Sequence, residues 1–96
     1  MKTKAELIDI INGIKPILRS RFKVKNIGIF GSCARDEGTE DSDVDILVEL
    51  YEPIGLDLVD LKFLLEEKTG EKVDLVTSKS LRSEFEKDIM KEVVFT

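Results

Sequence analysis

The feature that most constrains this chain is a strand-like stretch over residues 43–50 that begins with two acidic side chains. Apolar residues occupy alternate positions: Val44, Ile46, Val48 and Leu50. The residues between them are Asp43, Asp45, Leu47 and Glu49. Successive side chains of a strand point to opposite faces. The stretch therefore predicts a sheet that packs on a core through one face and carries paired carboxylates on the other.

Segments with helical and strand periodicity alternate around this stretch. In chain order we expect a helix whose apolar face runs from Leu7 to Leu18, a strand over 25–30, a single helical turn over 33–35 and the strand over 43–50. A helix over 58–69, a strand over 73–77, a last helix marked by Leu81, Phe85 and Ile89, and an edge strand over 93–95 follow. This order predicts one small α/β (α+β) domain, residues 1–96, with a mixed sheet of three to four strands flanked by helices.

The expected helices carry their own boundary signals. Thr3 and Glu6 have the spacing of a capping box, which satisfies free backbone amides at a helix start. Pro16 lacks a backbone N–H, so it either kinks the first helix or lies in the first turn of a second piece. Gly70 is placed to end the helix over 58–69 in the left-handed conformation.

Composition excludes several kinds of chemistry. The 96 residues include no histidine and one cysteine, Cys33, which excludes a histidine-based triad, an imidazole zinc site, an iron–sulfur cluster and an internal disulfide. A net charge of −5 disfavours direct nucleic-acid binding, because that affinity depends on neutralising phosphates. The 20 acidic residues favour oxygen ligation of a hard cation such as Mg²⁺.

The sequence also predicts no membrane association. No apolar run approaches the roughly 18 residues of a membrane-spanning helix, and the chain starts on an amphipathic segment rather than on a signal peptide. A lone cysteine fits a reducing compartment. We therefore expect a cytoplasmic protein.

The acidic pair is the main indication of chemistry. Ten residues separate Gly31-Ser32 from Asp43-Val44-Asp45. Two carboxylates about 5 Å apart repel each other by roughly 3 kcal/mol at an effective dielectric of about 20. A divalent cation removes that repulsion and converts the pair into a metal site. The alternative is a strand edge whose carboxylates simply face water.

Asp74 is a second acidic signal, because it interrupts the apolar strand over 73–77. A buried carboxylate needs a partner, and Asp43 and Asp45 are its natural neighbours if the two strands are adjacent. Three aspartates on adjacent strands suit two Mg²⁺ ions about 3.5–4 Å apart, the geometry of phosphoryl and nucleotidyl transfer. The alternative for Asp74 is a salt bridge to Lys72 or another lysine.

Gly31 and Ser32 end a strand and precede a helical turn, a place where backbone N–H groups can bind an anion. The Ser32 hydroxyl can add a hydrogen bond to a terminal phosphate, and the Arg35 guanidinium offers a cationic fork. Ser42 either caps the turn before the acidic pair or orients its first carboxylate. These four residues are candidate nucleotide-binding groups; an ordinary turn with a surface arginine is the alternative.

Together these segments resemble the minimal nucleotidyltransferases of the DNA polymerase β-like superfamily. The resemblance rests on Phe30-Gly31-Ser32-Cys33-Ala34-Arg35, on Ser42-Asp43-Val44-Asp45-Ile46-Leu47-Val48, and on Asp74 after the next helix. It covers nearly the whole chain. It implies the polymerase β-like nucleotidyltransferase fold and an ATP-binding, Mg²⁺-dependent enzyme, a protein adenylyltransferase.

The resemblance also implies a role for each candidate residue. Asp43 and Asp45 would hold the nucleotide-bound metal and the catalytic metal, two Mg²⁺ ions per site. Asp74 would complete the catalytic metal site and help to deprotonate the acceptor hydroxyl. Gly31 and Ser32 would hold the triphosphate of ATP, and pyrophosphate would be the second product.

The acceptor is expected on a partner protein. A chain of 96 residues can build the donor site and has little left for a deep acceptor pocket. The resemblance implies an antitoxin that adenylylates a HEPN-type toxin, with tyrosine as the expected acceptor. Two alternatives remain open: a catalytically inert antitoxin that masks its toxin, and a sensor that binds Mg-ATP without releasing pyrophosphate.

Two further segments need interpretation. Glycine usually follows the arginine in this family, whereas this chain has Asp36 there. Aspartate tolerates a left-handed backbone, and we expect its carboxylate to face away from the triphosphate. The C-terminal apolar residues either form a docking patch or pack on the sheet as core, the interpretation that we favour: Leu81, Phe85, Ile89, Val93 and Phe95.

Overall fold

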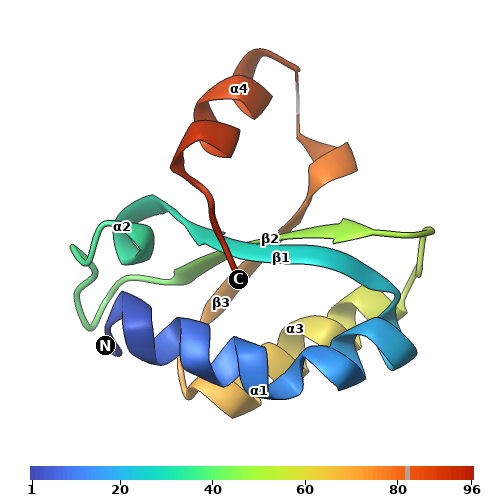
Figure 1. Ribbon diagram of the computed structural model, residues 1–96. Helices are drawn as coiled ribbons and strands as arrows, with labels where there is room; N and C mark the ends of the chain where they lie inside the picture. Colours follow the sequence, from blue (N-terminus) through green and yellow to red (C-terminus); the bar gives the residue numbers. More distant parts are fainter. Residues whose placement is uncertain (82) are drawn as a thin grey trace.

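The computed structural model describes residues 1–81 and 83–96, and its elements follow the predicted order (Figure 1). They are α1 (Lys4–Phe22), β1 (Val24–Phe30), α2 (Gly31–Ala34), β2 (Val44–Leu50), α3 (Asp57–Thr69), β3 (Val73–Thr77), a 3₁₀ turn η1 (Ser78–Ser80), α4 (Ser83–Glu92) and β4 (Val94–Phe95). The predicted strand over 73–77 is confirmed to the residue.

The four strands form one mixed sheet in the order β3-β2-β1-β4. β1 is antiparallel to β2 and to β4, whereas β2 and β3 are parallel. The parallel register places the first residues of β2 and β3 at the same end of the sheet and sets Asp45 beside Asp74. The predicted fold, a small mixed sheet flanked by helices, is confirmed.

The helices cover the two faces of the sheet unequally. α1 and α3 lie against one face, whereas α4 stands over the other (Figure 1). As predicted, the apolar face of β2 belongs to the core between the sheet and helices α1 and α3, with Val44, Ile46 and Val48 fully buried. Leu47 is also fully buried, so the face that carries the aspartates is covered at that position.

The predicted helix signals are confirmed at both ends. Thr3 Oγ1 accepts a hydrogen bond from the Glu6 amide, and the Thr3 amide donates to Glu6 Oε1. α1 runs through Pro16 without restarting. Gly70 ends α3 in the left-handed conformation, and its amide donates to the Glu66 carbonyl. None of the helices in the described residues combines the length and the apolar character that crossing a membrane requires.

Two helix boundaries differ from the prediction. The turn expected over 33–35 spans Gly31–Ala34, because Gly31 adopts a φ of 69° and bends the chain directly out of β1. Leu81, expected in the last helix, has an extended backbone and precedes α4, which begins at Ser83.

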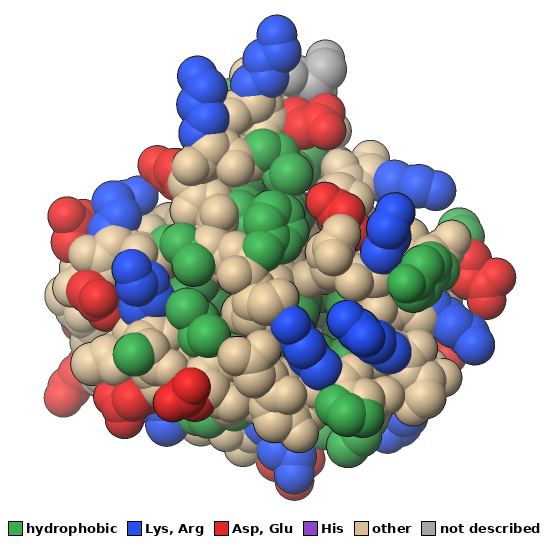
Figure 2. Space-filling model, in the orientation of Figure 1, with side chains coloured by type: hydrophobic (Ala, Val, Ile, Leu, Met, Phe, Trp, Pro, Cys, Tyr) green, Lys and Arg blue, Asp and Glu red, His purple; other side chains and the backbone are tan. Residues whose placement is uncertain are grey.

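The predicted C-terminal edge strand is present as β4. Gly28 of β1 leaves room for β4 to approach closely. A Cβ on Gly28 would lie 2.6 Å from Val93 Cγ1 and 2.8 Å from the Val94 carbonyl oxygen. The core interpretation of this region is wrong for Phe85 and Phe95, which are 55% and 42% exposed. Hydrophobic side chains gather on the surface below α4 (Figure 2), because that helix stands away from the sheet.

Candidate active site

Two carboxylates are paired across the parallel strands. Asp45 of β2 and Asp74 of β3 are register partners, and both lie on the face opposite the α1–α3 core. Asp43, one residue before β2, is exposed at the same end of the sheet. The structure therefore brings the three predicted acidic residues to one edge.

The surroundings of Asp74 correct one expectation. Its side chain is exposed rather than buried, because β3 is an edge strand and presents Asp74 on the less covered face. In the described part of the chain, the ion pairs join Arg35 to two glutamates, and none joins Asp74 to Lys72. The salt-bridge alternative for Asp74 is therefore not realised.

The electrostatics of the acidic set show mutual repulsion. Burial and the negative charges of Asp74 and Asp43 raise the pKa of Asp45 to about 6, against a smaller lowering by Arg35. A cation bound nearby would favour the charged form. Within residues 1–81 and 83–96, no three His, Cys, Asp or Glu side chains already converge tightly enough to hold a metal ion. The acidic set is thus open rather than a closed cage.

A pH dependence of stability follows from the raised pKa of Asp45. The folded protein holds the proton of the Asp45 carboxyl more tightly than the unfolded chain does, because the pKa of Asp45 in the unfolded chain is near the ordinary 3.8. Protonation of Asp45 therefore adds to the free energy of unfolding. This contribution is complete below pH 3.8 and is lost as the pH rises through about 6. After allowance for solvent screening it amounts to about 1 kcal/mol.

Thermal unfolding of the wild type and of Asp45→Asn, in EDTA from about pH 4 to about pH 8, measures this contribution. Carboxylates outside the acidic set titrate equally in both proteins, so the difference between the two melting temperatures reports the charge of Asp45 together with its repulsion from Asp43 and Asp74. We expect the variant to match the wild type at the acidic end and to be more stable at the alkaline end. A difference that does not change with pH would contradict the assignment.

Gly31 makes room for the Asp45 carboxylate. A Cβ on Gly31 would collide with Oδ2 of Asp45, and the residue has a left-handed φ of 69°. Ser32 follows in the same turn and is partly exposed. Two of the predicted nucleotide-binding residues therefore lie beside the acidic set.

The other two predicted nucleotide-binding side chains are engaged elsewhere. Arg35 Nε donates to Glu37 Oε2 at 3.0 Å, and its Nη1 donates to Glu92 Oε1 at 3.2 Å. Ser42 Oγ accepts from the Thr39 amide at 3.1 Å and so caps the turn, the first of its two predicted roles. Sequence reasoning misses both glutamates. The close spacing of Arg35 and Glu37 is a usable signal, whereas nothing in the sequence links Arg35 to α4.

Asp36, the departure from the family pattern, faces away from the acidic set as expected. Its backbone is left-handed, with φ 55°, and its Oδ1 accepts a hydrogen bond of 2.7 Å from the Lys4 amide at the start of α1. The extra negative charge is therefore directed at a helix N-terminus, where it is favourable.

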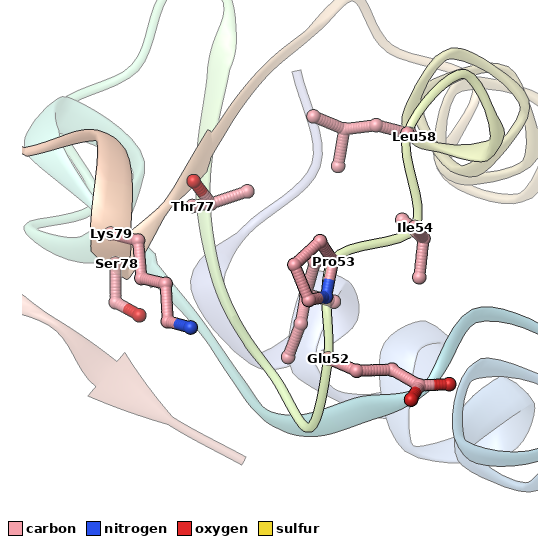
Figure 3. A pocket seen from close by; sticks show the side chains of 9 residues that line it. Glu52, Pro53, Ile54, Leu58, Thr77, Ser78 and Lys79 are labelled. Atoms are coloured by element: carbon pink, nitrogen blue, oxygen red, sulfur yellow. The ribbon is translucent and has the colours of Figure 1, made fainter.

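An apolar cavity of about 250 Å³ lies at the opposite ends of β2 and β3. Figure 3 shows Ile54 and Leu58 on one side of it and Thr77, Ser78 and Lys79 on the other. The cavity is formed where the two parallel strands end, whereas the aspartates lie where they begin. It is therefore not part of the acidic site.

Two adjacent parallel strands carry acidic side chains, and a glycine turn lies beside them. This arrangement is suited to nucleotidyl transfer. The chain belongs to the nucleotidyltransferase domain family, whose model matches residues 11–96. It is 46% identical over 96 residues to the protein adenylyltransferase MntA of Thermococcus cleftensis, covering 99% of this chain and 97% of that protein. It is 45% identical over 93 residues to a Methanocaldococcus jannaschii protein provisionally named a protein adenylyltransferase, covering 96% and 95% of the two chains.

Solved structures agree with the fold. One that is provisionally described as a minimal nucleotidyltransferase matches with a TM-score of 0.83 and 31% identity, over 97% of this chain and 95% of that one. A complex of tri-AMPylated Shewanella oneidensis HEPN toxin with MNT antitoxin matches with a TM-score of 0.61 and 19% identity, over 96% and 66% of the chains. This second match shows the fold alone. The resemblance found in the sequence is confirmed.

Proposed function

We propose that this chain is a protein adenylyltransferase that transfers AMP from ATP to a tyrosine hydroxyl of a HEPN-type toxin and thereby acts as its antitoxin. The observation that carries the proposal is the pairing of Asp45 with Asp74 beside Gly31. The name of the Thermococcus relative supports the reaction, and the complex of an AMPylated toxin with its antitoxin supports the class of partner.

The candidate metal ligands fit a hard divalent cation. Three carboxylates supply only oxygen ligands, the type that Mg²⁺ prefers, and their repulsion is visible in the raised pKa of Asp45. In this proposal Asp43, Asp45 and Asp74 hold two Mg²⁺ ions. Bound Mg²⁺ would neutralise the triphosphate and the charge that develops on the leaving pyrophosphate.

The remaining roles fall to residues of the glycine turn and to Asp74. Gly31 and Ser32 bind the triphosphate, and Arg35 joins them when phosphate displaces its glutamate partners. The acceptor oxygen attacks the α-phosphorus of ATP, and the bond from that phosphorus to the pyrophosphate oxygen breaks. The proton of the acceptor hydroxyl passes to the Asp74 carboxylate, whose exposure gives the acceptor access.

A polar cleft of about 280 Å³ beside Asp43 is the proposed entry for the acceptor. Its lining residues are Glu40, Asp41, Ser42, Asp43, Gly70, Glu71 and Lys72. Four carboxylates against one lysine favour an acceptor surface that carries positive charge, and they disfavour a nucleic acid.

The test uses the purified protein, ATP, Mg²⁺ and the product of the neighbouring gene, which this proposal expects to be the HEPN-type partner. We expect the partner to gain AMP by mass spectrometry, with one pyrophosphate released for each AMP, and EDTA to abolish both. Absence of any gain under conditions in which the two proteins bind would contradict the proposal. Neutralisation of the toxin without any gain would favour the inert, masking antitoxin.

A further inference from the structure

We propose that residues 1–4 form a brace that fixes the two loops beside the acidic site relative to each other. The first loop, residues 35–43, joins α2 to β2, and the second loop, residues 70–72, joins α3 to β3. Asp36 and Glu71 are then positioning residues for transfer. The structural part of this inference rests on contacts alone, and its consequence for transfer rests on the proposed function.

The brace contacts the first loop and the preceding helix α2 through the Lys4 backbone amide and the Met1 side chain. The Lys4 amide donates to Asp36 Oδ1 at 2.7 Å, a short hydrogen bond to a carboxylate. Met1 Sδ lies 3.3 Å from Cys33 Sγ and would meet any Cβ placed on Gly38. The residues just after the glycine turn are therefore held against the start of α1.

The brace contacts the second loop through Lys2. The Lys2 amide donates to Glu71 Oε1 at 3.2 Å, and Lys2 Nζ lies 3.2 Å from the position of a Cβ on Gly70. The Glu71 amide in turn donates to Oγ1 of Thr69, which is fully buried. One short segment thus bonds to both loops through backbone amides only two residues apart.

The polar cleft beside Asp43 lies between the same two loops. Asp43 ends the first loop and Glu71 belongs to the second, and both line the cleft, so the separation of the two loops affects the width of the cleft. α1 does not need Asp36 to start, because the capping box of Thr3 and Glu6 is already complete. A glycine at position 36 would keep the left-handed backbone and would remove the acceptor. Asp36 therefore has a role beyond the local turn.

Amide hydrogen exchange of the full chain, without nucleotide, tests the brace. Asp36→Gly and Glu71→Ala each remove one contact, whereas Asp36→Asn and Glu71→Gln retain an acceptor and serve as matched controls. Each contact-removing variant is expected to speed exchange of the Ser42 amide in the first loop and of the residue-71 amide in the second, relative to the intrinsic exchange rate of the residue at each position. The expected factor is roughly tenfold, that of one lost charge-assisted hydrogen bond.

Faster exchange confined to the loop that carries the substitution would overturn the brace, because each contact would then act only locally. Transfer kinetics give a second measurement. Asp36→Gly is expected to raise the KM for the partner relative to Asp36→Asn, because it releases the first loop while leaving the charges that line the acceptor cleft unchanged. Coupled exchange in a protein that transfers no AMP would uphold the brace while contradicting the proposed function.

Discussion

Replacing Asp45 by asparagine is expected to reduce AMP transfer by about 10³-fold, roughly 4 kcal/mol of activation free energy, while stabilising the metal-free protein above about pH 6. The two effects have one cause. The carboxylate that is costly beside Asp74 and Asp43 is the one proposed to ligate metal, so removing its charge relieves repulsion and removes a ligand together. Single-turnover transfer with ATP and thermal unfolding in EDTA measure the two effects.

Asp60→Asn is the matched control, because Asp60 is an exposed aspartate of α3 that lies in no part of the acidic site. We expect transfer to be unchanged in it and its stability to lack the pH-dependent gain. Transfer that survives in Asp45→Asn would remove the catalytic assignment. In cells, full protection by an Asp43→Asn, Asp45→Asn double variant would show that masking, not chemistry, neutralises the toxin.

The parts of the fold that could be predicted depend on short-range patterns. The alternation over 43–50 identifies β2 and its buried face because side-chain direction repeats every two residues. The Thr3–Glu6 capping box and Gly70 mark helix ends because each acts within one turn. The Asp-x-Asp pair shares a face for the same local reason. These signals do not require knowledge of which strand lies at the edge.

The features that could not be predicted depend on strand order and on contacts between distant segments. Asp74 is exposed because β3 is an edge strand, and the apolar sequence around it gives no indication of this. Arg35 is held by Glu92, 57 residues later. Phe85 is exposed because α4 stands away from the sheet, although its spacing is that of a core-facing helix.

Gly31→Ala is expected to have the second-largest effect on AMP transfer. The substitution introduces backbone strain and a steric clash with Asp45 at the same position. A left-handed φ of 69° costs a non-glycine residue about 1–2 kcal/mol, so the free energy of unfolding should fall by about that amount. The new Cβ also meets Oδ2 of Asp45 and must displace that carboxylate. A displacement of about 1 Å is enough to lower transfer by roughly 10²-fold.

Gly55→Ala separates these two costs. Gly55 has a φ of 58°, so the backbone strain is similar, yet a Cβ there has no neighbour within 4 Å. We expect Gly55→Ala to lower the melting temperature about as much as Gly31→Ala and to leave transfer unchanged at temperatures where both variants are folded. If both substitutions lowered transfer equally, the loss would follow from general destabilisation, and the fit of Gly31 against the Asp45 carboxylate would have no part in catalysis.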